Sequence, residues 1–130
     1  MSCVVAEFNI TIHEGTTYDE NFRWKVDDIL VSLLGITGTM QVRKKITDET
    51  PILDLPFVSD EWVADGASGI YLMDVGVDDR YRIYINNEDS AGICASHRDI
   101  PGTYNLFLFK DGEVVLKQYG IANLIAAVKR

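Results

Sequence analysis

The strongest constraint on what this chain can fold into is an alternation of apolar and polar residues with a period of two. Phe8, Ile10 and Ile12 alternate with Asn9 and Thr11. Successive side chains of a β-strand point to opposite faces, so this pattern predicts strands with one buried face. The same pattern recurs in short runs at 22–26, 36–43, 52–55, 69–77, 81–85, 103–110 and 113–120.

Turn signals separate these runs, and the most specific of them is Asp111-Gly112. Asp-Gly between two strand-like runs favours a type I′ turn, in which both central residues have positive φ. The runs 103–110 and 113–120 are therefore expected to pair as antiparallel neighbours. Helix is expected only as a turn near 87–91 and as a short piece within 121–130. Seven or eight short strands with this spacing favour an all-β sandwich or barrel.

Length and composition predict a single soluble domain. The chain has 130 residues, 47% of them hydrophobic, without an internal repeat or a linker-like stretch, so residues 1–130 are expected to share one core. The N-terminus lacks the basic region of a signal peptide. No apolar run approaches the ~20 residues of a membrane helix, so we expect no membrane insertion. Cys3 and Cys94 can pair, but synthesis in a cytoplasm favours reduced thiols.

The charge balance argues against nucleic-acid binding. The chain has 12 Lys and Arg residues against 20 Asp and Glu residues, which gives a formal net charge of −8. Binding to phosphate backbones needs a basic face, whereas the largest basic cluster here is Arg43-Lys44-Lys45. We therefore expect no nucleic-acid partner.

No sequence motif indicates a catalytic site, a cofactor or a metal. The chain lacks Gly-rich phosphate loops, His-Glu zinc motifs, Cys-x-x-Cys pairs and a nucleophile elbow. Cys94 and His97 lie three residues apart, and we interpret this pair as accidental. Acidic doublets occur in expected turns at 27–28, 48–49, 60–61, 78–79 and 88–89. They lack calcium-loop spacing and are expected to be solvated, so we expect neither enzyme activity nor a cofactor.

Trp62 is the candidate for an exposed contact. It follows Ser59-Asp60-Glu61 in an expected loop. Aromatic rings at such positions can stack on a sugar or contact a partner protein, and burial in the core or in an interface is the competing interpretation.

The run 103–110 is apolar on both of its faces. One face carries Tyr and Leu side chains, and the other carries Phe107 and Phe109. A strand buried on both sides needs a cover on its outer face, and exposed apolar patches generally mark contact sites. Either the C-terminal segment 121–130 or a second subunit can supply the cover. The candidate assembly contacts are Phe107, Phe109, Leu124 and Ile125.

Several blocks follow one another in an order typical of a known family. They are Phe22-Arg-Trp-Lys25, Asp28 to Thr37, Met40-Gln-Val-Arg43, Ile52-Leu-Asp-Leu55, Tyr81 to Ser90, Pro101-Gly-Thr-Tyr104 and Asp111-Gly112-Glu-Val114. In order and spacing these blocks resemble small immunoglobulin-like β-sandwich proteins of tailed bacteriophages and prophages, which are encoded among tail, baseplate and fibre proteins. The resemblance extends over residues 8 to 120, with longer segments than in the family at 61–68 and 93–100.

The resemblance implies an immunoglobulin-like antiparallel β-sandwich of about seven to eight strands with little helix. It also implies a non-enzymatic structural component of a tailed-phage virion, acting as a tail, baseplate or fibre adaptor. Its partners would be other virion proteins and copies of itself, and its location would be the virion after synthesis in the host cytoplasm. No catalytic residue is carried over, because the family is structural.

Two other functions stay open at the level of sequence. One is a carbohydrate-binding β-sandwich that recognises a host surface glycan through Trp62 and nearby acids. The other is a small acidic inhibitor that mimics the charge of nucleic acid, although the negative residues are spread over turns rather than gathered in one block.

Overall fold

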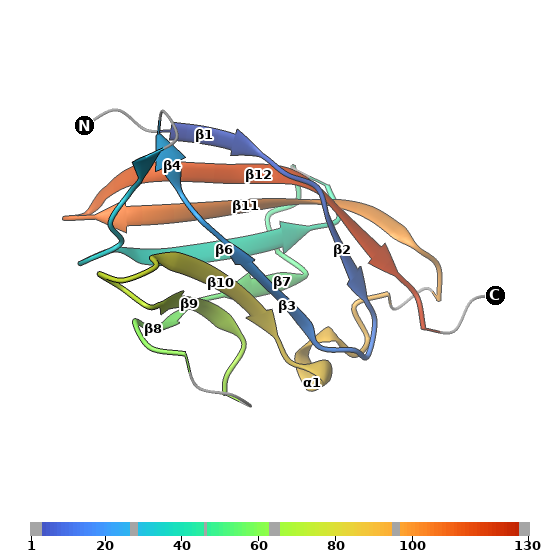
Figure 1. The fold of residues 1–130 in the computed structure, drawn as a ribbon. Helices are drawn as coiled ribbons and strands as arrows, with labels where there is room; N and C mark the ends of the chain where they lie inside the picture. Colours follow the sequence, from blue (N-terminus) through green and yellow to red (C-terminus); the bar gives the residue numbers. More distant parts are fainter. Residues whose placement is uncertain (1–3, 27–28, 46, 63–65, 95–96, 128–130) are drawn as a thin grey trace.

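Two β-sheets face each other (Figure 1). A cluster of buried apolar side chains from both sheets forms the core. The computed structural model describes residues 4–26, 29–45, 47–62, 66–94 and 97–127. The six-stranded sheet contains β1 (Val4–Glu7), β12 (Glu113–Ile125), β11 (Ile100–Lys110), β6 (Thr37–Arg43) and β7 (Leu53–Leu55) in that order, with β2 (Ile10–His13) also pairing with β12. The four-stranded sheet contains β3 (Tyr18–Phe22), β10 (Arg80–Ile85), β9 (Gly69–Met73) and β8 (Phe57–Ser59).

Two small elements complete the described structure. The strands β4 (Lys25–Val26) and β5 (Ile29–Leu30) form a separate two-stranded sheet. The short helix α1 (Asn87–Ser90) lies where the sequence predicts a helical turn, and the side chain of Asn86 caps it by accepting a hydrogen bond from the backbone N–H of Asp89.

The expected fold class, an all-β immunoglobulin-like sandwich with little helix, is confirmed. The order β3-β10-β9 in one sheet and β12-β11-β6 in the other reproduces the division of strands in the immunoglobulin fold. The expectation of antiparallel pairing holds for most strands, but β1 and β2 pair with β12 in parallel, and so does β8 with β9. The described residues form twelve strands rather than seven or eight, because β1 and β2 are one interrupted strand and several others are two- or three-residue pieces.

The predicted hairpin is confirmed as the longest strand pair of the described structure. Asp111 and Gly112 have φ values of 52° and 80°, as the expected type I′ turn requires. The hairpin joins β11 and β12 from Lys110 opposite Glu113 to Ile100 opposite Leu124, with one irregularity between Leu108 and Phe109.

The C-terminal segment is not the helical or separate docking piece that the sequence predicts. Residues 121–125 continue β12, where Ala122 to Ile125 pair with β2 on one side and Ile121 to Leu124 pair with β11 on the other. The segment therefore extends the sheet and leaves the outer face of the hairpin uncovered. Residues 128–130 lie outside the described part of the chain.

A chain of buried polar groups joins the two sheets through the core. The hydroxyl of Tyr81 on β10 donates to Oε1 of Gln118 on β12, and Nε2 of Gln118 donates to the hydroxyl oxygen of Tyr104 on β11. The Tyr104 hydroxyl in turn donates to the backbone carbonyl of Phe8. Each buried polar atom in this chain gains a partner, which removes the penalty that an unpaired buried group would carry. Burial raises the pKa of the Tyr81 phenol far above its ordinary value.

The first strand bends where it passes Gly120. The backbone of Phe8 and the side-chain Oδ1 of Asn9 lie so close to Gly120 that a Cβ at this position would collide with the Phe8 carbonyl. The side chain of Asn9 accepts a hydrogen bond of 3.0 Å from the backbone N–H of Ile121. The bend divides the first strand into β1 and β2 and brings the Phe8 carbonyl to the hydroxyl of Tyr104.

The substitution Gly120→Ala should destabilise the fold. A methyl group there must displace backbone rather than a flexible side chain, which costs about 1–3 kcal/mol. We expect a lower thermal unfolding temperature, measured by circular dichroism. Gly112→Asn is the matched control, because no atom lies near its Cβ position and Asn tolerates positive φ. Equal losses in the two variants would show that the close passage over Gly120 is not the cause.

Glu14 ties the C-terminal end of β12 to the loop after α1. Its Oε1 accepts a hydrogen bond of 3.1 Å from the backbone N–H of Ala127, and its Oε2 accepts one of 2.9 Å from that of Cys94. These bonds favour the charged carboxylate, so the backbone N–H of Cys94 foremost, and then that of Ala127, lower the pKa of Glu14.

A pH series should show this contribution of Glu14. Because its pKa is lower in the folded chain than in the unfolded chain, the carboxylate stabilises the fold above the ordinary Glu pKa, and this stabilisation is lost as the pH falls through the folded value. Glu14→Gln should therefore unfold at a lower temperature than wild type near neutral pH, and the difference should shrink in acid. Thermal unfolding from about pH 7 to about pH 3 measures it. Glu49→Gln, at an exposed position, should show no such trend.

Candidate functional site

The solvent side of the six-stranded sheet is the principal candidate surface. Pairing places Phe107 of β11 between Lys117 of β12 and Thr39 of β6, and Val5 of β1 continues this row. The neighbouring rows add the other side chains that point outward from these strands, namely Glu7, Gln41, Arg43, Thr103, Asn105, Phe109, Tyr119 and Ile121. We call this surface the outer face.

Aromatic rings lie at the centre of the outer face. Phe107 and Phe109 are half-buried, with ring centroids 6.3 Å apart and ring planes tilted by 44°. Nζ of Lys117 lies 5.9 Å from the ring centroid of Phe107 and 5.7 Å from that of Tyr119. These distances are within the range of a cation–π attraction. No carboxylate of the described residues forms an ion pair with Lys117.

A shallow pocket of about 330 Å³ opens on the outer face beside Tyr119. Its walls come from β1, β11, β12 and the bend after β1, and its lining includes Glu7, Asn9, Thr103 and Ile121. The hydrogen bond from the Tyr119 hydroxyl to Glu7, together with the negative charge of Glu7, raises the pKa of Tyr119. The pocket thus combines apolar surface from Tyr119 and Ile121 with polar side chains from Glu7, Asn9 and Thr103.

The four predicted assembly contacts do not share one surface. Phe107, Phe109 and Ile125 are half-buried and point outward from the six-stranded sheet. Leu124 is 0% exposed, because the alternation along β12 turns it into the core. The prediction for Leu124 is therefore wrong, and its side chain cannot contact a partner.

Trp62 is half-buried and belongs to an aromatic cluster on the four-stranded sheet. Its ring meets those of Tyr71 and Tyr84 nearly edge-on, at centroid distances of 4.9 and 5.0 Å. The guanidinium carbon of Arg82 lies 3.5 Å from the centroid of the Trp62 ring, and Asp19 binds Arg82 through an ion pair. Much of the indole is thus engaged within the chain, in agreement with the packing interpretation of Trp62.

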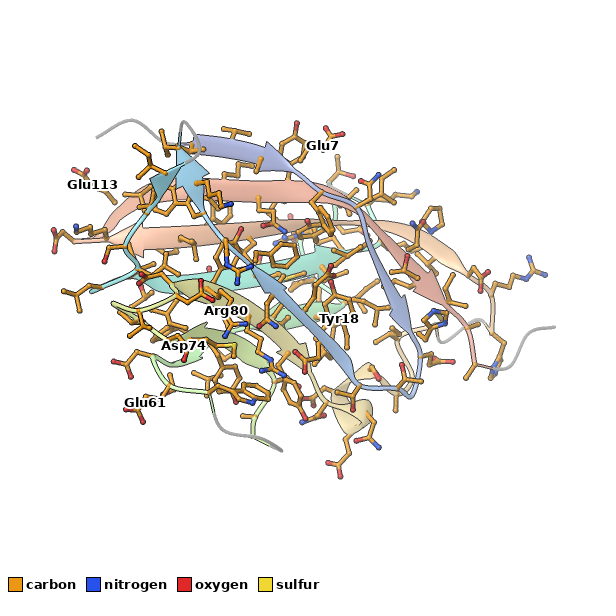
Figure 2. The ribbon with its side chains drawn as sticks, viewed as in Figure 1. Glu7, Tyr18, Glu61, Asp74, Arg80 and Glu113 are labelled. Atoms are coloured by element: carbon orange, nitrogen blue, oxygen red, sulfur yellow. The ribbon has the colours of Figure 1, made fainter. Side chains whose placement is uncertain are left out.

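A larger open pocket of about 620 Å³ lies beside Trp62. It is lined by Leu34, Asp60, Glu61, Trp62, Met73, Asp74 and Val75. Figure 2 shows Glu61 and Asp74 on the same side of the molecule, away from Glu7 on β1. Asp74 is paired with Arg80, whereas Asp60 and Glu61 form no ion pair with any described residue. The combination of carboxylates and the Trp62 indole gives this pocket both charge and apolar surface.

The Cys94–His97 pair does not form a nucleophilic site. Cys94 is buried, and desolvation, followed by the charges of Glu14 and Asp99, raises the pKa of its thiol. A raised pKa lowers the reactive thiolate fraction. The hydrogen bond between the two residues joins backbone groups, from the N–H of His97 to the carbonyl of Cys94. Cys3, the other cysteine, lies outside the described residues.

The two residues of the acidic doublet 78–79 have different surroundings. Asp78 is exposed to solvent and pairs with Arg23 at 2.8 Å, and this hydrogen bond lowers the pKa of Asp78. Asp79 is buried, and its Oδ1 accepts hydrogen bonds from the backbone N–H groups of Leu33 and Gly76. The expectation of solvated turns is therefore wrong for Asp79. The doublet 27–28 lies outside the described residues.

The sequence pattern did not predict two exposed apolar residues. Leu34 is 73% exposed and Val77 is 88% exposed, and both lie in loops. Leu34 ends the largely apolar run 29–34 and Val77 ends the alternating run 69–77, so the sequence pattern marked neither residue as a surface contact. Within the described residues, no group of three His, Cys, Asp or Glu side chains is arranged to hold a metal ion, and no helix is long and apolar enough to cross a membrane.

Comparisons with known proteins add little to the structure. No protein-family model matches the chain, and no curated protein matches it. Among solved structures, 22 chains match. One of them belongs to the ZIG-8–RIG-5 IG1-IG1 heterodimer, with 8% identity, a TM-score of 0.35, and coverage of 93% of this chain and 82% of that chain. The fold assignment accordingly rests on the strand order and pairing described above.

Proposed function

We propose that the chain is a non-enzymatic structural component of a tailed-phage virion that acts through protein–protein contacts on its outer face. The observation that carries the proposal is the pair of half-buried rings, Phe107 and Phe109, on the solvent side of the long hairpin. Aromatic side chains are enriched at the cores of protein interfaces, where they bury large areas at a small entropic cost.

The outer face is somewhat smaller than one side of a standard interface. β11 has 11 residues, and at ~3.4 Å per residue it is ~37 Å long. Four adjacent strands at a spacing of ~4.8 Å are ~19 Å wide, but β1 has 4 residues and β6 has 7, so the face covers ~540 Å². A standard interface buries about 800 Å² on each partner. An interface of standard size would therefore cover the whole outer face and extend beyond it.

The virion assignment comes from the family resemblance of the sequence blocks described above. A repeated virion component must bind other virion proteins or copies of itself, and this role does not need an enzyme active site. We propose both kinds of partner, with the finished protein located in the virion. The outer face supports an assembly role because its rings lie on a broad sheet surface rather than inside an enclosed cavity.

The double variant Phe107→Ser, Phe109→Ser should lose assembly. Removing both rings takes away the apolar centre of the outer face, so we expect at least a tenfold weaker association, since ~1.4 kcal/mol gives that factor and interface aromatics often contribute more. Light scattering over a concentration series measures association with copies of the chain. Co-purification with proteins encoded beside it measures association with other partners.

Val5→Glu, on the same face, tests whether misfolding could explain a loss of assembly. Val5 is 60% exposed, so a charge there disturbs the outer face without removing core packing. It should weaken association in the same direction, and thermal unfolding should remain at the wild-type temperature. Undiminished assembly in both variants would overturn the proposed use of the outer face.

The pocket beside Trp62 supports a second candidate function, the recognition of a host surface glycan. Carboxylates and the Trp62 indole line this pocket together. Such a combination suits a sugar, because sugars are bound by polar side chains together with aromatic rings.

If this function holds, Trp62→Ala and Glu61→Gln should each lose binding on a glycan array that wild type binds. The Trp62 variant also loses packing against Tyr71 and Tyr84, whereas Glu61 is exposed and its variant should unfold like wild type. Absence of wild-type binding to every glycan on the array would remove this candidate.

A further inference from the structure

The exposed large apolar side chains of the described residues fall into two groups. Val5 and Ile121 lie on β1 and β12 in the outer face, and Phe8, just after β1, packs its ring against Phe22 of β3. In the second group, Leu34 and Val77 lie in loops, and Val26 and Ile29 lie in the small sheet of β4 and β5. Single exposed apolar residues need no explanation, but two separate groups on one small domain indicate two contact surfaces.

Leu34 and Val77 of the second group belong to loops that are fastened together at one end of the sandwich. Oδ1 of Asp79 binds the backbone N–H of Leu33 at 3.0 Å and that of Gly76 at 3.1 Å, so it joins the loop of Leu34 to the turn of Val77. The turn between β9 and β10 lies at the same end as the β11–β12 hairpin turn (Figure 1). The loops are therefore held in place before any partner arrives. We call Leu34, Val77, Asp60, Glu61 and Asp74 together the loop end.

The loop end carries three carboxylates, whereas the outer face carries two cations, Lys117 and Arg43, and one carboxylate, Glu7, which is bonded to the Tyr119 hydroxyl. Asp60, Glu61 and Asp74 line the pocket that Leu34 borders, and the first two have no ion-pair partner among the described residues. On the outer face, Lys117 lies over two aromatic rings without a carboxylate partner there. An unpaired cation beside apolar rings fits a partner that offers apolar side chains together with carboxylates. The loop end offers both.

The shapes of the two surfaces also fit. Leu34 and Val77 project from the loop end, at 73% and 88% exposure. The outer face has the pocket of about 330 Å³ beside Tyr119, next to the unpaired Lys117. An aliphatic side chain in this pocket would place the neighbouring carboxylates of the loop end beside the Lys117 ammonium. The net charge of −8 opposes association only weakly, because salt at physiological concentration screens charges beyond ~8 Å.

We propose that the loop end of one copy docks on the outer face of the next copy. This inference rests on the proposed function and names a second copy of the chain as the occupant of the outer face. The contact joins two different surfaces, so it leaves a free loop end and a free outer face on every pair. Repetition then builds either a closed ring or an open filament, depending on the rotation between copies.

Two variants, each defective in one surface, test the contact. Leu34→Ser with Val77→Ser removes the projecting side chains of the loop end, and Lys117→Glu reverses the charge of the outer face. Wild type should form species larger than a dimer by light scattering, whereas each variant alone should have the 14.6 kDa mass of one chain. An equal mixture of the two variants should form a dimer and nothing larger, because only one intact loop end and one intact outer face remain to meet.

Lys44→Glu is the matched control for the charge change. It makes the same reversal at an exposed site five residues beyond Thr39, ~17 Å along the strand direction from the row of Lys117, and should assemble like wild type. Thermal unfolding confirms that all variants are folded.

The possible outcomes separate this inference from the proposed function. If the loop-end variant assembles like wild type while the Lys117 variant does not, the outer face remains an assembly surface and the loop end is overturned as its occupant. If wild type has the mass of one chain at every concentration, self-docking is overturned, and co-purification with neighbouring virion proteins still tests the outer face. If neither the loop-end variant nor Lys117→Glu changes assembly, this inference is overturned. If the Phe107, Phe109 and Val5 variants also assemble like wild type, the proposed function is overturned as well.

Discussion

The register of the β11–β12 hairpin is the constraint on which the candidate surface depends. The Asp111-Gly112 turn pairs Lys110 with Glu113, and the irregularity between Leu108 and Phe109 then shifts the register so that Phe107 lies opposite Lys117. A slip of one residue in a strand would turn its outward side chains inward and its core side chains outward. The two-residue turn and this bulge together therefore decide that the rings and the lysine share one face.

The buried polar chain from Tyr81 to the Phe8 carbonyl makes this register hard to change. Gln118 must reach Tyr81 across the core and Tyr104 on the neighbouring strand at once, and a shifted strand would leave these groups unpaired in a dry interior. The apolar core tolerates small adjustments, whereas hydrogen bonds with fixed partners do not. These buried hydrogen bonds thus fix which side chains of β11 and β12 point to the outer face.

Local patterns in the sequence predicted the strands and the hairpin, because alternation and turn chemistry act over a few residues. Pairing between distant strands leaves no such local pattern, so the parallel addition of β1 and β2 to β12 was not foreseen. The run from Ile121 onward is apolar almost throughout, which hid the alternation that buries Leu124. Leu34 and Val77 were also missed, because Leu34 ends a largely apolar run and Val77 ends an alternating run, and neither pattern shows where the strand stops and the loop begins.

The parallel pairing of the first strand with the last also has a mechanical consequence. β1 begins at the end of the sandwich where β12 starts, and β12 ends at the opposite end (Figure 1). A force applied between the two chain ends would therefore act along these strands and load their backbone hydrogen bonds in shear, all together rather than one after another. The start of β1 and the end of β12 are both held by the sheet itself, so tension between them would be resisted by the backbone hydrogen bonds of both strands together.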